Sequence, residues 1–315
     1  MVLNNSLIMK YLLEKNKLNN KQIETVNNIL ALGLDRPYSP TDLPEKIEKI
    51  ISDKTKNLLS KWNLSSLYFN KSSLSSISKC EGIVIANAEK KSSIMNSSII
   101  VGNISHKAIQ VSYTHKLNNV DEIINNITEN MKTSEKIEDT YFHGLDSVKQ
   151  SEIISQATSR VTNFLDDWPP LQSIWSPRFE ESLSYKSGKL LLSSRVDLVI
   201  GRPRSDGKRT LMLIDFKSGN INDDHKNEAL LYSLIATLRH KIMPWRSVVY
   251  SLSSGEYTDL DHTGDDLLNF ADILSDSVNR TIESLLELRS IKLTPGDHCT
   301  WCPKSLVCVE SLVKK

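Results

Sequence analysis

The stretch Leu190–Gly219, LLLSSRVDLVIGRPRSDGKRTLMLIDFKSG, decides the fold, because it holds two apolar segments joined by a polar loop. The two segments, Leu190–Ile200 and Thr210–Phe216, are short and rich in Leu, Ile and Val, which is typical of buried strands. Gly201–Lys208, between them, is polar and contains Gly and Pro, which favour a loop. The sequence therefore predicts two neighbouring strands of one sheet.

The sheet extends on both sides of this stretch. Phe179–Tyr185 alternates apolar and polar residues and Lys186–Lys189 is a turn, so the chain enters Leu190–Ile200 through a β-hairpin. After the second strand the pattern runs helix, strand, helix, over Asp224–His240, Arg246–Leu252 and Asp265–Arg289. We therefore expect an α/β fold, with a mixed central sheet flanked by helices.

The chain before the hairpin is mostly helical. In residues 1–66 helical patterns cover Asn20–Leu32 and Leu43–Trp62, with Gly33 as a stop signal for the first, and no motif accompanies them. Three more segments have helical spacing: Gly102–Gln110, Val120–Lys132 and Ser147–Trp168, the last ended by Pro169 and Pro170. We expect a helical N-terminal extension over 1–66 and a main domain over 67–315.

Composition excludes several classes of protein. Charged residues make up 24% and hydrophobic residues 39%, a soluble globular balance, and no window approaches the ~18 apolar residues of a membrane span. Lys and Arg number 39 against 38 Asp and Glu, so the net charge of +1 excludes a polybasic protein. A local basic patch could still bind DNA. With 6% aromatic residues, a series of base-stacking platforms is not expected.

The first residues do not predict a secretory signal. Polar and charged residues interrupt the apolar stretches of Met1–Lys17, and no small-residue cleavage site follows. A cytoplasmic protein is the simplest interpretation, with an organelle or the nucleus as alternatives. In a reducing compartment, the four cysteines are expected to be metal ligands or core thiols rather than disulfides.

Two carboxylates and a lysine stand at the ends of the apolar strands. Asp197 lies within the first strand, and Asp215 and Lys217 are two residues apart on the second, so these two side chains point to one face. Converging carboxylates suit Mg²⁺ or Mn²⁺, and a nearby lysine can orient or deprotonate a water for phosphodiester hydrolysis. The alternative is a buried Asp–Lys ion pair with a separate structural Asp.

The cysteines have the spacing of metal ligands. Cys299, Cys302 and Cys308 form a close triplet, whereas Cys80 lies far upstream. Four thiolates bind either zinc or an iron–sulfur cluster. Unrelated core thiols are a poor explanation for the triplet and a better one for Cys80 alone.

The order of these motifs resembles the RecB-like branch of the PD-(D/E)XK nucleases, in particular the members with an iron–sulfur cluster, such as the AddB nuclease domain and the CRISPR-adaptation nucleases. The resemblance covers roughly Ser72 to Cys308, without the middle helical stretch. Five segments carry it: Leu74–Cys80, Gly102–Gln110, Arg195–Asp197, Asp215–Gly219 and Pro295–Pro303. All five stand in the family's order, and no cysteine is left over.

The resemblance implies a restriction-endonuclease-like core with a defined set of site residues. His106, Asp197 and Asp215 would bind Mg²⁺ or Mn²⁺, assisted by the carbonyl of Phe216, and Lys217 would serve the attacking water. The four cysteines would hold a [4Fe–4S] cluster, with Zn²⁺ as the alternative; they are Cys80, Cys299, Cys302 and Cys308.

One motif departs from the family. Where the family has Gln-x-x-x-Tyr on the helix after the lysine, this chain has Glu228 and Tyr232, which share one helix face. Glu228 adds negative charge near phosphate and metal. It could bind the metal, weaken contact with DNA, or simply face solvent.

The functions that follow are a metal-dependent deoxyribonuclease and two rivals. The first would act on single-stranded or end-exposed DNA, with unwinding left to a helicase partner because the chain has no Gly-x-x-x-x-Gly-Lys-Ser/Thr loop. The rivals are a catalytically silent DNA-binding scaffold subunit and a zinc-stabilised structural protein. Four basic residues of the loop could contact phosphates, or the loop could be merely solvated: Arg202, Arg204, Lys208 and Arg209.

Overall fold

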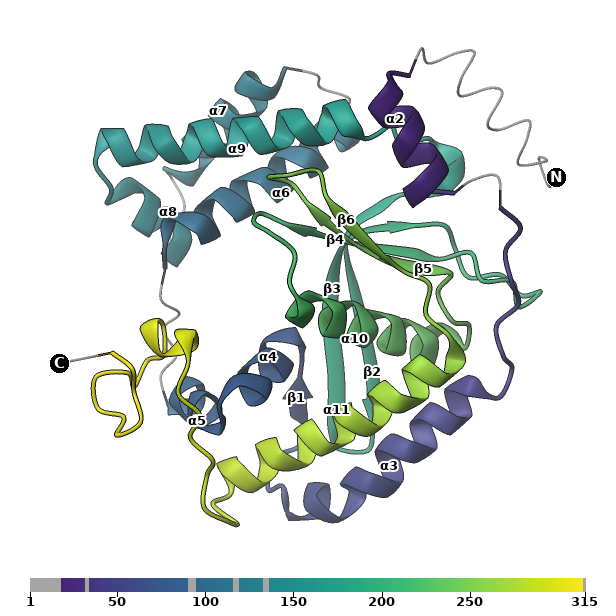
Figure 1. The fold of residues 1–315 in the computed structure, drawn as a ribbon, viewed down its shortest axis with the longest axis vertical. Coiled ribbons are helices and arrows are strands. Elements are labelled where there is room, and N and C mark those ends of the chain that lie inside the picture. The colour runs from purple at the N-terminus through teal and green to yellow at the C-terminus, as the bar shows by residue number, and fades with distance from the viewer. Residues whose placement is uncertain (1–17, 32–33, 90–94, 116–118, 133–135, 314–315) are drawn as a thin grey trace.

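The computed structural model describes residues 18–31, 34–89, 95–115, 119–132 and 136–313. It is a mixed α/β fold with a central sheet between two helical layers, which confirms the expected fold class (Figure 1). Met1–Lys17 and the predicted helix end at Leu32 and Gly33 lie outside the described residues.

The sheet is built on β3, the first strand of the deciding stretch. β3 (Leu190–Ile200) pairs along its length with β2 (Arg178–Ser187), which confirms the predicted hairpin. β4 (Met212–Lys217) runs antiparallel to the C-terminal end of β3 and parallel to β5 (Arg246–Ser251). The sequence analysis did not predict two short strands of the described residues. They are β1 (Leu67–Phe69), parallel to the start of β3, and β6 (Tyr257–Leu260), antiparallel to β5.

Helices cover both faces of this sheet (Figure 1). One layer holds α6 (Ser97–His115), α7 (Val120–Met131), α8 (Ile137–His143) and α9 (Ser147–Asp167). The other holds α3 (Leu43–Lys61), α10 (Asp223–His240) and α11 (Gly264–Leu285). The first element of the described residues is α2 (Asn20–Glu24), which continues into a π-helical turn at Thr25–Ile29.

Side chains of β4 alternate between two cores, which explains the position of its polar residues. Ile214 and Phe216 pack with α6 and α9, whereas Leu213 packs with α10 and α11. Asp215 and Lys217 share the face of Leu213 because alternate residues of a strand lie on one face. Their side chains therefore meet α10, the helix that connects the parallel strands β4 and β5.

Helix α3 packs on this second core rather than standing apart. Leu43, Ile47 and Ile51 are buried in the same cluster as residues of α10 and α11. Within the described residues, no helix is both long and apolar enough to cross a bilayer.

The C-terminal segment meets α4 (Lys71–Lys79) and α5 (Glu81–Glu89) at one edge of the molecule (Figure 1). Glu81 is only 2% exposed, and its carboxylate pairs with Arg280 and Arg289 and accepts the backbone N–H of Lys292. Hydrogen bonds from Arg289, which outweigh burial, lower the pKa of Glu81 to about 2. This buried carboxylate thus joins α5 to the segment that leads into the cysteine triplet.

We expect Glu81→Gln to lower the free energy of unfolding by about 2 kcal/mol, because it leaves two arginines without their shared carboxylate. The pKa of Glu81 is about 2, against an ordinary 4.5, so its contribution is complete above about pH 4.5 and fades as the pH falls towards 2. Urea unfolding at several pH values measures this. Glu283→Gln removes another partner of Arg289 and is the control. Equal effects of the two variants at pH 7 would contradict the central role of Glu81.

Candidate active site and cysteine site

The candidate active site lies where β3 and β4 separate. Their pairing ends at Leu198 and Ile214, so Asp197 and Asp215 stand side by side at the fork. The backbone N–H of Phe216 donates a hydrogen bond to Asp197 Oδ2 at 2.6 Å. Because a buried N–H needs an acceptor, this bond fixes the Asp197 carboxylate at the point where the ladder ends.

Asp215 is the most deeply buried carboxylate of the site, at 2% exposure. Tyr232, from α10, donates its hydroxyl to Asp215 Oδ1 at 3.0 Å. Lys217 Nζ lies 2.7 Å from Asp215 Oδ2 and 2.5 Å from Glu228 Oε2. Glu228 and Tyr232, one turn of α10 apart, therefore both reach the residues of β4, as their spacing predicted.

Neighbouring charges determine the protonation states of Asp215 and Lys217. Burial alone would raise the pKa of Asp215, but Lys217, Lys71 and the Tyr232 hydroxyl hold it below its ordinary value. Burial would lower the pKa of Lys217, but Asp215 and Glu228 outweigh it and raise that pKa. Asp215 is thus ionised and Lys217 is a cation at neutral pH. A lysine in this state orients and donates rather than accepting a proton.

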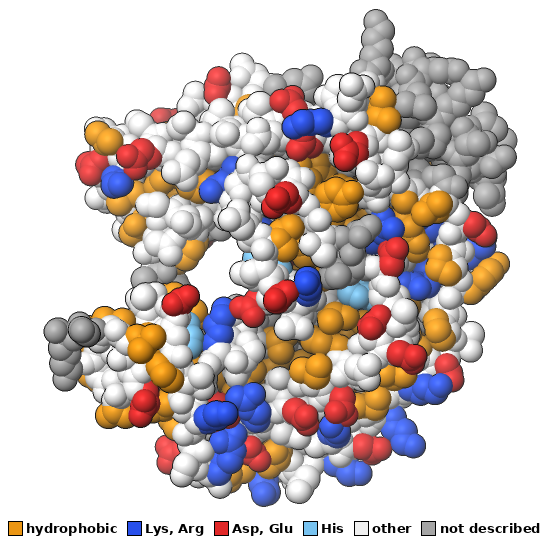
Figure 2. Space-filling view, viewed as in Figure 1, with side chains coloured by type: hydrophobic (Ala, Val, Ile, Leu, Met, Phe, Trp, Pro, Cys, Tyr) orange, Lys and Arg blue, Asp and Glu red, His pale blue; other side chains and the backbone are white. Residues whose placement is uncertain are grey.

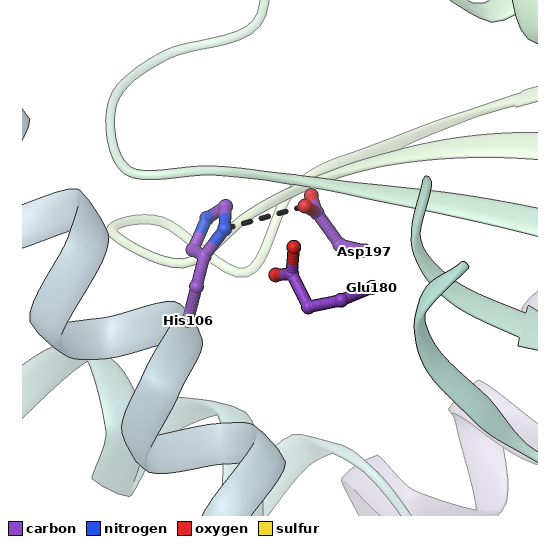
Figure 3. Close-up of side chains that lie close together, drawn as sticks. All are labelled: His106, Glu180 and Asp197. Carbon is purple, nitrogen blue, oxygen red and sulfur yellow. Dashed lines mark ion pairs between the residues drawn. The ribbon is translucent and has the colours of Figure 1, made fainter. Parts of the chain in front are cut away.

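A second group of ligand-type side chains lies beside the first (Figure 3). His106 Nδ1, from α6, is 3.3 Å from Asp197 Oδ1. Among the described residues, His106, Glu180 and Asp197 form a compact set whose ligand atoms all lie within 4.8 Å of one another. Asp215 is outside this set, and Tyr232 and Lys217 engage its carboxylate.

Glu180 is the site residue that sequence reasoning missed. It lies within the predicted strand Phe179–Tyr185, but nothing in its spacing separates it from its neighbour Glu181. In the structure its φ is +52°, in the left-handed region that non-glycine residues rarely adopt. Burial and the nearby charge of Asp197 raise the pKa of Glu180.

The compact set lies in a groove of about 1040 Å³. The groove runs between the layer of α6, α7 and α8 and the opposite wall of β2, β3 and the start of α4, and the space-filling view shows the molecule hollowed on this side (Figure 2). Polar side chains dominate its lining. Four are basic, four are acidic and four carry amides: Lys71, Lys107, Lys136, Arg195; Glu138, Asp139, Glu180, Asp197; and Asn70, Asn103, Gln110, Asn130.

The basic loop between β3 and β4 lies apart from this groove, and none of its four predicted DNA contacts lines the groove. Arg204 pairs with Asp206, and Lys208 with Asp35. Arg209 donates to three backbone carbonyls, those of Pro244, Trp245 and His262. A role of the loop in DNA binding stays a prediction.

The donor set suits a divalent cation. Carboxylate oxygens with one imidazole match the ligands that Mg²⁺ and Mn²⁺ take in proteins. Asp215 Oδ2 is buried and makes no well-aligned hydrogen bond, although Lys217 lies close to it. Lys217 therefore compensates this oxygen at the fork, where a bound cation would share it.

All four cysteines line one cavity of about 340 Å³ on the edge that carries α4 and α5. Cys80 directly follows α4, and its sulfur accepts the N–H of Thr294 at 3.4 Å. Backbone hydrogen bonds at Leu312 and Gly296 lower the pKa of the Cys299 thiol. Cys80 is thus brought to the triplet across the chain.

Comparison with known proteins agrees with this architecture. The sequence profile of the PD-(D/E)XK nuclease superfamily matches residues 82–309, which is more than half of the 315 residues and contains the fork and the cysteine triplet. No curated protein sequence matches the chain. With the profile match, the mixed sheet and the Asp-x-Lys strand in agreement, the chain belongs to the PD-(D/E)XK nuclease superfamily.

Proposed function

We propose that this protein is a Mg²⁺- or Mn²⁺-dependent deoxyribonuclease of the RecB-like type, with its nuclease domain in residues 67–315. The observation that carries the proposal is the ionised Asp215, 2% exposed, beside the cationic Lys217 at the fork that Asp197 shares. A purely structural ion pair between Asp215 and Lys217 would not require the Asp197 carboxylate and the His106 imidazole beside it in a polar groove.

Each residue of the fork has a role in phosphodiester hydrolysis. His106, Asp197 and Asp215 would hold the cation, which would polarise a phosphoryl oxygen and favour deprotonation of water. Lys217 donates hydrogen bonds to the attacking water or to the charge that develops on the phosphate. Tyr232 holds Asp215 in place, and Glu228 holds Lys217.

We infer that the substrate is single-stranded or end-exposed DNA. The groove offers separate lysines and several amides, which suit phosphates and unpaired base edges. The positive charge of Lys71 lowers the pKa of both Asp215 and Glu180, which indicates that Lys71 lies close to the fork. With Arg195, it is a basic side chain of the groove that would hold a phosphate next to the scissile bond.

We propose that the cysteine cavity holds a [4Fe–4S] cluster rather than zinc. Zinc, with bonds of about 2.3 Å in tetrahedral geometry, places its thiolates about 3.8 Å apart. No three of the four cysteine sulfurs, all on described residues, lie within 4.8 Å of one another. The backbone N–H of Thr294 donates to the sulfur of Cys80, and hydrogen bonds to sulfur are typical of iron–sulfur clusters.

We expect Asp215→Asn and Lys217→Gln each to slow DNA cleavage at least ~100-fold, because each removes charge that stabilises the transition state. Asparagine keeps an oxygen for the Tyr232 hydroxyl, so Asp215→Asn should fold. The measurement is cleavage of end-labelled DNA with Mg²⁺, Mn²⁺ or EDTA, and circular dichroism checks the fold.

Asp223→Asn, an exposed carboxylate at the start of α10, is the control and should cleave normally. Full activity of a folded Asp215→Asn protein would refute the active site. A wild type that binds DNA and cuts nothing with either metal would instead be the silent scaffold.

We expect the double variant Lys71→Gln with Lys107→Gln to weaken binding of single-stranded DNA about tenfold and to lower the salt slope by about 1.4, as loss of two phosphate contacts to a single strand implies. Fluorescence anisotropy with EDTA measures binding without cleavage. The matched variant, Arg204→Gln with Lys208→Gln in the loop, should bind normally. The reverse result would place the DNA on the loop.

We expect Cys80→Ala to destabilise the protein about as much as Cys302→Ala, because a metal centre that closes a long loop adds its binding energy to folding. Both should lose the absorbance near ~400 nm of a thiolate-bound iron–sulfur centre. Iron, sulfide and zinc are measured in anaerobically purified protein. A Cys80→Ala protein with full metal content and normal stability would make Cys80 a core thiol, whereas zinc without iron would favour the structural zinc site.

A further inference from the structure

Glu180 has no assigned role in the reaction proposed above, yet it lies at the floor of the groove. The ladder of β2 and β3 pairs Phe179 with Leu198 and Glu181 with Val196, so Glu180 stands opposite Asp197. Residues directly opposite in an antiparallel pair point to the same face. Glu180 and Asp197 therefore present their carboxylates together, and His106 reaches them from α6 (Figure 3).

The local backbone departs from a regular strand at this one position of the pair. Glu180 has a φ of +52°, whereas the register on either side of it is unbroken. A left-handed residue between two stretches of a ladder in the same register is uncommon for a side chain other than glycine, and such conformations gather at functional sites. This left-handed backbone conformation determines where the carboxylate of Glu180 lies relative to Asp197.

The positive charges of His106, Arg195 and Lys71 compensate this carboxylate only in part. The ion pair found for Glu180 among the described residues is with Arg195, at 3.7 Å, and that side chain is 69% exposed. Two carboxylates within 4.8 Å repel one another in a half-buried groove. A divalent cation bound between them removes this repulsion and uses all three ligand atoms at once.

We propose that Glu180 is a ligand of the divalent cation, together with His106 and Asp197. This assignment rests on the proposed nuclease function and adds to it a metal ligand supplied by β2, outside the Asp-x-Lys strand. Glu181, its neighbour, offers a matched control: it points to the other face of β2 and lies 3.5 Å from Arg178.

The test measures Mn²⁺ binding to the full chain without DNA, by electron paramagnetic resonance of free Mn²⁺. We expect Glu180→Gln to raise the dissociation constant at least tenfold and Glu181→Gln to leave it unchanged. Glutamine is isosteric with glutamate, and a thermal melt of each variant checks that it folds. Equal Mn²⁺ affinities of wild type and Glu180→Gln would overturn the assignment, as would equal losses in both variants.

Cleavage is measured separately, so the two proposals fail in different ways. A wild type that binds Mn²⁺ through Glu180 and does not cut DNA would support this ligand and refute the nuclease. A wild type that cuts DNA, with unchanged Mn²⁺ affinity in Glu180→Gln, would keep the nuclease and refute the ligand.

Discussion

An ionised carboxylate buried in the middle of the fold is the constraint on which the site depends. Asp215 is 2% exposed, and an isolated charge in such a place is strongly unfavourable. Lys217 on the same strand and Tyr232 on α10 compensate it, and Glu228 in turn fixes Lys217. The position of α10 against β4 is thus tied to electrostatics as well as to apolar packing.

The cysteine cavity and the groove are linked by the short helix α4. Cys80 follows the C-terminal end of α4, while Lys71 at its other end lines the groove. Glu81 adds an ion-pair connection from the next residue to α11 and to the segment before the triplet. Helices α4 and α5 are therefore joined to the C-terminal segment beside the catalytic face, through protein contacts that do not depend on a cluster.

Much of the fold could be predicted because strong local signals agree with the tertiary structure. The apolar segments on either side of Gly201–Lys208 became β3 and β4, and the spacing of Glu228 and Tyr232 placed both on one face of α10. β1, with three residues, and β6, with four, are too short for any periodicity to show. Their existence depends on neighbours in the sheet rather than on their own pattern.

Site residues could be predicted where their type and their spacing along one element already indicate a function. They could not be predicted where the pairing of strands or the backbone conformation brings them together. The Asp-x-Lys spacing placed Asp215 and Lys217 on one face, and the structure pairs them. Glu180 could not be separated from Glu181, because only the register with β3 and a left-handed φ bring it to His106 and Asp197. The charge of the β3–β4 loop is visible in the sequence, but its pairing with Asp206, Asp35 and backbone carbonyls is not.

The most direct test of this account is the location of the metal. Crystals soaked in Mn²⁺ and measured at a wavelength with strong manganese anomalous scattering would show the ion without reference to activity. The account predicts one strong peak at the fork, about 2.1 Å from oxygens of Asp197 and Asp215. Peaks confined to surface carboxylates, with Asp215 still paired to Lys217 alone, would contradict it.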